Sequence, residues 1–286
     1  MIAITGASGQ LGRLVIQSLL ARNIAATQIV AAVRDPSKVA DLAALGVVVR
    51  QADYSRPDTL TAAFAGVDRL LLISSNELGQ RAMQHRAVID AARTAGVKLL
   101  AYTSVLHADS SPLGLAEEHR STEAAIAASG LPFVLLRNGW YTENYAASIP
   151  QALQHGALLG SAGNGRIASA ARADFAEAAA VVLTTDGHEG RVLELAGDTS
   201  YTLAEFAAQI ARAAGKPVAY SDMPQADFKA VLLQVGLPEG LAELLSDSDA
   251  AAAQGALADE SKTLSRLIGR PTTPWQDTVA TTVQAS

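Results

Sequence analysis

Short apolar runs alternate with longer amphipathic segments along the chain as far as Arg137. Each run has four or five consecutive residues, mostly Val, Ile, Leu and Ala. Continuous runs of this kind are typical of strands buried on both faces of a parallel sheet. The sequence therefore predicts strands at Ile2–Thr5, Ile29–Val33, Val47–Arg50, Leu70–Ile73, Leu99–Thr103 and Phe133–Leu136.

Helical periodicity fills the intervals between these strands. Gln10–Ala21 places Leu11, Leu14, Val15 and Leu19 on one face, and Ala82–Ala95 repeats the pattern. Glycine, a common stop signal for helices, closes the helical segments at Gly46, Gly66, Gly96 and Gly130. Strands that alternate with helices in this way predict an α/β fold, a doubly wound parallel sheet of the Rossmann type with right-handed crossovers.

The pattern changes after Arg137. Gly156–Gly165 is rich in glycine and is expected to be a loop, whereas Ala173–Thr184 reads as a helix and Val192–Leu195 as one more strand. From Thr202 on the chain reads as helices, the first with a capping-box spacing. We therefore expect a Rossmann domain over residues 1–150, with a returning segment near 166–200, and a smaller, mainly helical domain over 151–286.

The amino-acid composition and the net charge exclude several classes of protein. The 286 residues are 49% hydrophobic and 17% charged, which suits a folded core and not a disordered chain. Cysteine is absent, so thiol chemistry, disulfides and cysteine-bound metals are excluded. The net charge of −6 with no basic run argues against nucleic acid. Without a signal peptide or a long apolar stretch, a cytoplasmic protein without membrane contact is expected, and a homodimer is compatible with the sequence.

A glycine-rich turn follows the first predicted strand and opens the first predicted helix. Glycines in this place let the backbone approach a pyrophosphate, and the helix N-terminus adds partial positive charge. The same residues could form an ordinary turn, but the strand–turn–helix context is the one that a dinucleotide site requires. The expected cofactor contacts here are Gly6, Ala7, Ser8, Gly9, Gln10 and Leu11.

Polar residues at the ends of the next strands extend this site. Arg34 follows the second strand and suits the 2′-phosphate of NADPH, whereas an acidic residue there would suit NADH. Asp35 is the alternative, but it precedes Pro36 and is expected to cap a helix. We favour NADPH, with NADH as a weaker cofactor. Asp53 is expected to contact the adenine, and small polar residues expected to let the cofactor pass are Ser74, Ser75 and Asn76.

Several motifs together resemble the NmrA-like branch of the atypical short-chain dehydrogenases. They are Thr5–Gly12, Gln51–Tyr54, Leu72–Ser75, Ala101–Ser104 and Leu135–Tyr141. Within that branch the chain is most similar to bacterial NAD(P)H:quinone oxidoreductases of type 2, with the triphenylmethane dye reductases close behind. The resemblance extends over nearly the whole chain. It implies a Rossmann domain that binds NADPH and a small domain that closes over the substrate. It also adds cofactor contacts at Asn138, Gly139, Trp140 and Tyr141.

The Tyr-x-x-x-Lys pair of most short-chain dehydrogenases is missing, because no tyrosine has a lysine four residues later. In the helix where the pair would lie, Leu115 takes the tyrosine place and His119 the lysine place. Carbonyl reduction to an alcohol benefits from a positioned acid, whereas a quinone accepts hydride as a weakly basic phenolate. A flavin-free quinone reductase is therefore favoured, with a dye reductase or a non-enzymatic NADP(H) sensor as alternatives.

The sequence offers fewer candidates for contact with the substrate than for contact with the cofactor. His119 could contact the cofactor or donate a proton, or could lie on an exposed helix face. For His85 and His107 surface roles are expected. Tyr141 and Asn144 could contact the quinone, and Trp140 with Tyr145 could instead fill the gap between domains. No pair of histidines has metal-ligand spacing, so no metal is expected.

Overall fold

The computed structural model describes residues 1–77 and 79–286. Its chain divides into two compact units, each of which combines several segments. The first unit consists of Met1–Ala108, Glu118–Asn138 and Ala173–Leu193. The second consists of Asp109–Glu117, Gly139–Arg172 and Glu194–Ser286.

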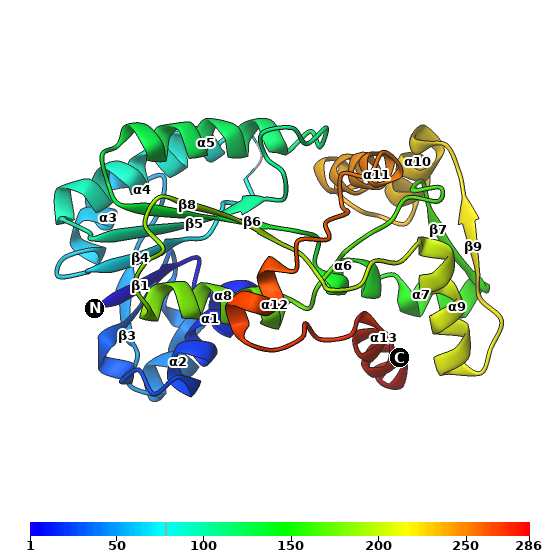
Figure 1. Cartoon of the computed structure of the whole chain (residues 1–286), viewed down its shortest axis with the longest axis horizontal. Coiled ribbons are helices and arrows are strands. Elements are labelled where there is room, and N and C mark those ends of the chain that lie inside the picture. Colours follow the sequence, from blue (N-terminus) through cyan, green and yellow to red (C-terminus); the bar gives the residue numbers. More distant parts are fainter. Residues whose placement is uncertain (78) are drawn as a thin grey trace. The chain divides into compact units, whose positions relative to one another are not determined.

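A seven-stranded sheet with the order β3-β2-β1-β4-β5-β6-β8 forms the centre of the first unit (Figure 1). All neighbouring pairs among β1 to β6 are parallel, which confirms the predicted doubly wound sheet. The strands are β1 Ile2–Thr5, β2 Ile29–Val33, β3 Val48–Gln51, β4 Arg69–Leu72, β5 Leu99–Val105, β6 Phe133–Asn138 and β8 Arg191–Leu195. The predicted strands differ from these only by shifts of their ends.

Helices cover this sheet (Figure 1), and the longer ones bury apolar residues against it. The helices are α1 Gln10–Ala21, η1 Ala26–Gln28, η2 Pro36–Val39, α2 Ala40–Ala44, α3 Pro57–Ala63, α4 Arg81–Ala95, α5 Ala116–Ala128 and α8 Arg172–Thr184. Helix α1 buries Leu11, Val15 and Leu19 of the predicted face, whereas Leu14 is only half-buried. Gly96 ends α4 in the left-handed conformation at φ 73°, so the predicted stop signal is confirmed there.

The core of this unit includes one conspicuous polar member. Phe64, Val88 and Leu100 are fully buried in it, together with the tyrosine Tyr102. A buried tyrosine hydroxyl needs a hydrogen-bond partner. The helix beside β5 therefore has to supply one, and that requirement shapes the candidate site below.

The second unit is mainly helical, as expected, but it also contains a small parallel sheet of β7 and β9. Its elements are α6 Thr142–Ala146, α7 Ile149–His155, β7 Ala157–Gly160, α9 Leu203–Ala214, β9 Ala219–Asp222, α10 Gln225–Gln234, α11 Glu239–Ala253, α12 Thr263–Ile268 and α13 Trp275–Ala285. Helix α9 begins after Thr202 with the predicted capping box, in which Thr202 and Glu205 bond each other's backbone N–H.

The β7–β9 sheet corrects two predictions. The sequence predicts a loop at Gly156–Gly165 and, after Thr202, helices with breaks between them but no strand, yet Ala157 pairs with Ala219 in a parallel ladder. Each strand has four residues, and β9 ends with Asp222, a residue type that is depleted in strands. Such short segments carry little local signal, so only the long-range pairing makes them strands.

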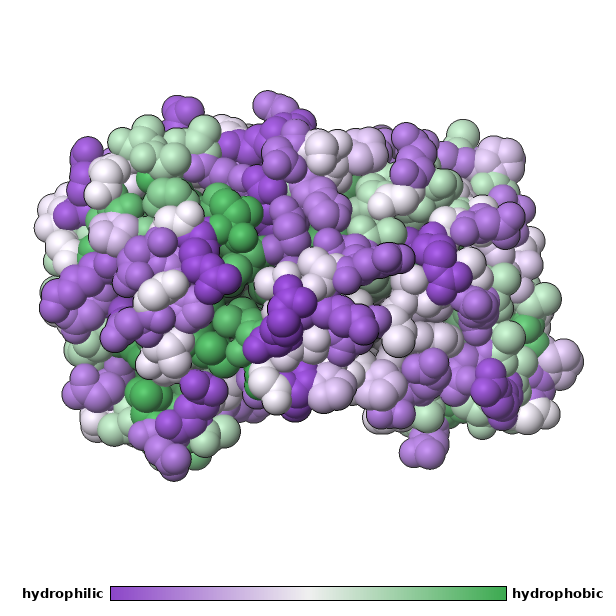
Figure 2. All heavy atoms as spheres, in the orientation of Figure 1, coloured by the Kyte–Doolittle hydropathy of each residue, from purple (hydrophilic) through white to green (hydrophobic). Residues whose placement is uncertain are grey.

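On the face shown in Figure 2, hydrophilic side chains predominate and strongly apolar residues come into view in separate patches. Large apolar side chains that are exposed are scattered in sequence, as at Leu45, Met83 and Val235. Within 1–77 and 79–286, none of the helices combines the length and apolar character needed to cross a bilayer.

A close contact between α1 and the turn before it fixes the start of that helix. A Cβ placed on Gly12 would lie 2.6 Å from the carbonyl oxygen of Gly6 and 2.7 Å from Cα of Ala7, both of which are backbone atoms. Gly6 itself has φ +58°, in the region that favours glycine. Geometry therefore requires glycine both at Gly6 in the turn and at Gly12 in α1.

We predict that Gly12→Ala destabilises the chain by about 1–3 kcal/mol, because the added methyl group would force backbone atoms apart. The midpoint of urea unfolding measures the effect. Gly240→Ala is the matched control, since Gly240 lies in a helix with no atom within 4 Å of an added Cβ. It should be neutral or stabilising by up to about 1 kcal/mol. Equal midpoints for the two variants would contradict the packing argument.

Candidate cofactor and substrate site

The strand order reverses between β1 and β4, which lie side by side at the centre of the sheet. Ligands of open α/β sheets bind outside the carboxyl ends of the strands at such a point. The turn Gly6–Gly9 follows β1, and Ser74–Asn76 follows β4. The structure thus brings these two predicted contact segments to the same edge of the sheet.

Backbone groups of the turn after β1 are open to a ligand. Ala7 and Leu11 are buried and anchor the turn, whereas Gly6, Ser8, Gly9 and Gln10 are exposed. Gly9 is the N-cap residue of α1, and no side chain caps the helix. The first N–H groups of any helix have no intrahelical partner, and in α1 no side chain replaces it, which suits an anion such as a pyrophosphate.

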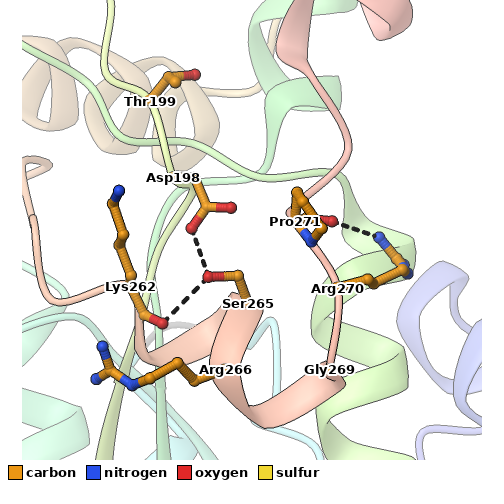
Figure 3. Close-up of a pocket in the computed structure, with 8 residues that line it drawn as sticks. All are labelled: Asp198, Thr199, Lys262, Ser265, Arg266, Gly269, Arg270 and Pro271. Atoms are coloured by element: carbon orange, nitrogen blue, oxygen red, sulfur yellow. Dashed lines mark hydrogen bonds between the residues drawn. The ribbon is translucent and has the colours of Figure 1, made fainter.

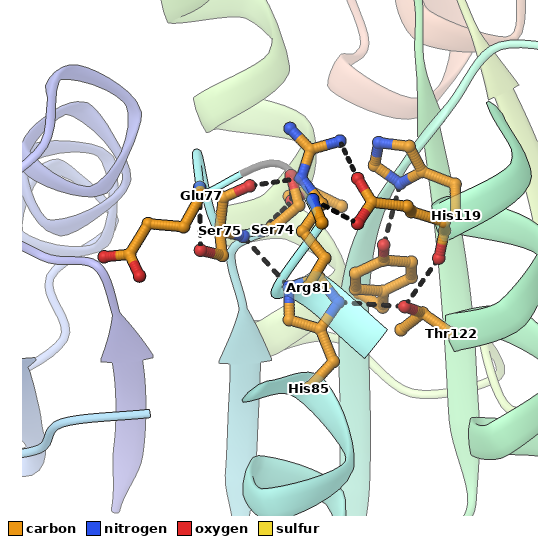
Figure 4. A network of polar contacts seen from close by, with 11 residues as sticks. Ser74, Ser75, Glu77, Arg81, His85, His119 and Thr122 are labelled. Carbon is orange, nitrogen blue, oxygen red and sulfur yellow. Dashed lines mark hydrogen bonds and ion pairs between the residues drawn. The ribbon is translucent and has the colours of Figure 1, made fainter. Parts of the chain in front are cut away.

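The loop after β4 is held by side chains from α4 and β5 (Figure 4). Ser75 N–H donates to Nε2 of His85 at 2.9 Å, and Nε of Arg81 donates to the Ser75 carbonyl. Ser74 N–H donates to Oγ1 of Thr103 at 2.9 Å. Because both backbone polar groups of Ser75 are engaged, the path of this loop is set before any ligand arrives.

His85 is fully buried, so the expected surface role is wrong. Since Nε2 accepts a hydrogen bond, the ring proton lies on Nδ1, which is 2.9 Å from Oγ1 of Thr122. Thr122 in turn donates to the Glu118 carbonyl. Burial, and then the charge of Arg81, lower the pKa of His85 to about 3. The ring is therefore neutral and acts as a fixed hydrogen-bond link between two helices and the loop.

His119 lies in the same network and not on an exposed helix face. Only 4% of the residue is exposed, and its Nδ1 is 2.7 Å from the hydroxyl of Tyr102. Burial, helped by the nearby charge of Arg81, lowers the pKa of His119 to about 3, and burial raises the pKa of Tyr102. Both groups are neutral at pH 7, so His119 has no imidazolium proton to donate. A contact of His119 with the cofactor stays a prediction.

Arg34 is exposed at the end of β2, where its guanidinium forms an ion pair with Glu77 at 2.6 Å. Glu77 is also bonded by Nε2 of the buried Gln84 at 2.7 Å. Asp35 caps the following η2 helix through Ser37, as expected. The guanidinium of Arg34 is thus accessible to a ligand at the sheet edge, but it is also paired with the carboxylate of Glu77.

Asp53 and Tyr54 follow β3. The carboxylate of Asp53 accepts a hydrogen bond from Ser55 N–H at 2.9 Å, which leaves its adenine contact a prediction. The Tyr54 hydroxyl donates to the Ile73 carbonyl at 2.9 Å and lies 2.6 Å from Oγ1 of Thr5. Tyr54 thereby ties the ends of β1 and β4 together, a role that the sequence did not indicate.

Asn138 ends β6 in the first unit, and its side-chain Oδ1 is buried without a hydrogen-bond partner among the described residues. Leaving a buried acceptor unpaired costs about 1–3 kcal/mol. A ligand that donates a hydrogen bond at this strand end would satisfy it. Together with the uncapped α1, this residue fits the dinucleotide that the sequence predicts.

The remaining predicted contacts belong to the second unit, where Gly139, Trp140, Tyr141 and Asn144 lie close together in sequence. Trp140 is 9% exposed, and its ring is 6.4 Å from that of Tyr145. The guanidinium carbon of Arg172 lies 4.8 Å from the centre of the Tyr141 ring. Its Nη2 donates to Oδ1 of Asn144 at 3.4 Å. Arg172 therefore joins the two residues expected to contact substrate.

The buried carboxylate of Asp249 bonds to Tyr145, next to the predicted acceptor residues. Tyr145 donates to Oδ1 of Asp249 at 2.8 Å, and Ser161 N–H donates to Oδ2 at 3.0 Å. Burial raises the pKa of Asp249 to about 6. Asp249 thus connects α6 and the turn after β7 to α11, and it supports the position of Tyr145 within the second unit.

A shallow, basic pocket of about 450 Å³ also lies in the second unit (Figure 3). Its lining residues are Asp198, Thr199, Lys262, Ser265, Arg266, Gly269, Arg270 and Pro271. The Asp198 carboxylate accepts bonds from Ser265 and from Thr272 N–H. None of the residues predicted from the sequence lines this pocket. Within the described ranges no group of three metal-ligating side chains occurs either.

The model of the family described as NAD(P)H-binding matches residues 6–186. The chain is 59% identical to quinone oxidoreductase 2 of Escherichia coli (strain K12), over 98% of each chain. A crystal structure of NADPH-dependent quinone oxidoreductase from that species, complexed with NADPH, matches with a TM-score of 0.96 over 98% of this chain and 99% of that one.

Two further proteins are similar over most of the chain. Triphenylmethane reductase of a Citrobacter species, complexed with NADP(H), is 39% identical with a TM-score of 0.94, over 99% of this chain and 100% of that one. An NmrA-like family domain-containing oxidoreductase of Aspergillus flavus is 31% identical over 75% of this chain and 72% of its own.

We predict that His119→Asn flattens the pH dependence of stability. The folded-state pKa of about 3 lies below the ordinary value of 6.5, so the unfolded chain binds the extra proton. Stability from this group is complete above pH 6.5 and falls as the pH drops towards 3, by up to about 1.4 kcal/mol per pH unit. Asparagine keeps a polar atom near Nδ1 but does not titrate.

Urea unfolding at several pH values between about 4 and 7 measures this slope. His155→Asn is the matched control, because His155 is exposed. The slope should become shallower in the His119 variant and stay at the wild-type value in the control. A His119 variant that keeps the wild-type slope would show that the imidazole does not titrate in this window.

Proposed function

This chain belongs to the NAD(P)H-binding family, among its NmrA-like reductases, and we propose that it is an NADPH-dependent reductase that transfers hydride to quinones without a flavin. Its 59% identity over 98% of both chains to a quinone oxidoreductase supports the acceptor class. The structure solved with NADPH supports the cofactor. A cytoplasmic location and the oligomeric state stay predictions.

Cofactor binding is assigned to the edge of the sheet at β1 and β4. The exposed turn Gly6–Gly9 and the uncapped start of α1 would hold the pyrophosphate. Arg34 would bind the 2′-phosphate, and the loop Ser74–Asn76, fixed by His85 and Arg81, would support the cofactor where it crosses the sheet. When bound, NADPH supplies the hydride, and the protein supplies its position.

The observation that carries the choice of acceptor is the neutral Tyr102–His119 pair. A catalytic tyrosine of the usual short-chain kind has a lowered pKa, but burial raises the pKa of Tyr102. The adjacent His119 is neutral as well. Alcohol chemistry would need a positioned acid or base. A quinone needs none at the hydride step, because its reduced oxygen is weakly basic and water can protonate it.

The acceptor is assigned to the second unit, at Tyr141 and Asn144. Tyr141 offers a flat ring, and Asn144 offers an amide that can donate to a carbonyl oxygen. The predicted division into residues 1–150 for the nucleotide and 151–286 for the substrate stays a prediction, with Tyr141 and Asn144 as acceptor contacts before that boundary. His119 is retained as a contact to the cofactor and not as a proton donor.

Reduction of a cationic dye is the second candidate. The triphenylmethane reductase is 39% identical to this chain over its whole length. A triarylmethane cation that accepts hydride becomes neutral and needs no proton at all. It would therefore react in a site without an acid or base, just as a quinone would.

We predict that Arg34→Ala weakens NADPH binding by roughly 10- to 100-fold, as expected for the loss of a charge-assisted hydrogen bond, and leaves NADH binding nearly unchanged. Glu77→Gln should strengthen NADPH binding by a few-fold at most, since it removes the carboxylate that shares the guanidinium in an exposed pair. Nucleotide fluorescence titration measures both. Equal weakening of NADPH and NADH in the Arg34 variant would rule out the phosphate contact.

The reaction itself is tested by mixing the purified chain with NADPH and a benzoquinone and following the absorbance of the reduced nicotinamide. We expect loss of NADPH well above the uncatalysed rate without added flavin. A triarylmethane dye in a parallel assay ranks the two acceptors. NADPH and NADP+ binding without turnover of either acceptor would overturn the proposal and favour the sensor.

A further inference from the structure

Arg172 is held in place by both its backbone and its side chain. Both carboxylate oxygens of Glu143 accept from Arg172 N–H, at 2.9 and 3.0 Å, at the start of α8. Thr142 N–H donates to the Ala170 carbonyl at 2.9 Å, and a parallel bridge joins Tyr141 to Ala170. The segment before α8 and the segment Tyr141–Asn144 are therefore aligned along their backbones.

The side chain of Arg172, held in this way, determines which way the amide of Asn144 faces. Nη2 of Arg172 donates to Oδ1 of Asn144, so the amide oxygen faces the cation. Its nitrogen, Nδ2, has no partner among the residues that the structure describes. Arginine has only donors, so the reverse orientation of the amide would place two donors against each other. The two N–H groups of Asn144 are thereby left to donate to a ligand.

Hydride transfer to a quinone creates the charge that such a donor stabilises. NADPH is oxidised to NADP+, and the quinone gains a hydrogen and two electrons as the hydroquinone monoanion. One quinone oxygen then carries the negative charge until water protonates it. A donor that is fixed in place before the reaction is worth more than one that must reorganise.

We infer that Arg172 is a positioning residue for quinone reduction, which orients and polarises the Asn144 amide so that it donates to the oxygen on which the negative charge develops. This inference rests on the proposed function. The cation also lies over the ring of Tyr141, and this contact helps to fix the plane of the guanidinium beside Asn144. The fixed, planar guanidinium can make both contacts at once, which a lysine cannot.

The test compares Arg172→Gln, Asn144→Ala and the double variant in steady-state quinone reduction. We expect each single variant to lower kcat for a benzoquinone by roughly tenfold or more, with NADPH affinity from fluorescence titration unchanged. Because Arg172 acts through Asn144, the double variant should be no slower than Asn144→Ala alone. Multiplied losses in the double variant, or an unchanged kcat in Arg172→Gln, would overturn the inference.

Arg166→Gln is the matched control, because Arg166 lies in the same unit but is bonded to Ser200 and paired with Glu205. It should keep the wild-type kcat. Arg172→Lys keeps the charge but loses the planar contact, and it is expected to fall between wild type and Arg172→Gln. A lysine variant as slow as the glutamine variant would assign the effect to geometry and contradict the polarising role.

Binding of 4-nitrophenol to the NADP+ complex gives a readout that does not depend on turnover. Its phenolate, which absorbs differently from the phenol, mimics the charged product oxygen. The wild type should favour the phenolate, and Arg172→Gln should lose that preference while it still binds the phenol. A preference that is equal in both proteins would refute the inference, whereas a wild type inactive with quinones would instead refute the proposed function.

Discussion

The close contact between Gly12 and the backbone of Gly6 and Ala7 sets where α1 begins, and the rest of the candidate nucleotide site depends on it. Because no Cβ is present, the helix starts directly behind the turn, and its first N–H groups remain uncapped beside β1. Ser74 and Ser75 follow the adjacent strand β4 and therefore lie at the same edge of the sheet. The partial positive charge at the start of α1 and the loop at Ser74 and Ser75 thus lie at the same edge of the sheet, which suits a dinucleotide.

Rigid positioning is the common physical feature of the two units. In the first, His85 and Arg81 engage the backbone of Ser75, and burial keeps the imidazole neutral so that it acts as a hydrogen-bond acceptor. In the second, Arg172 aligns Asn144. Neither arrangement supplies a protein acid or nucleophile, and this agrees with a reaction in which the cofactor carries the chemistry.

Much of this could be predicted from the sequence, because it depends on neighbours in the chain. Strand and helix periodicity, the glycine turn and the capping box at Thr202 involve residues within a few positions of one another, and the structure confirms them. The β7–β9 sheet escaped prediction because its two strands are short and far apart in sequence. Their β-structure exists only through the ladder between them.

The sequence by itself thus determined the doubly wound sheet, the glycine-rich turn before the first helix and the absence of the Tyr-x-x-x-Lys pair. Only the tertiary structure decided the roles of the polar side chains. His85 and His119 read as surface or ambiguous residues, yet packing buries both and makes them neutral links to Ser75 and Tyr102. Arg172 gave no signal, since its partners Tyr141 and Asn144 come from another segment. Periodicity records which face is apolar, but burial and hydrogen-bond partners come from folding.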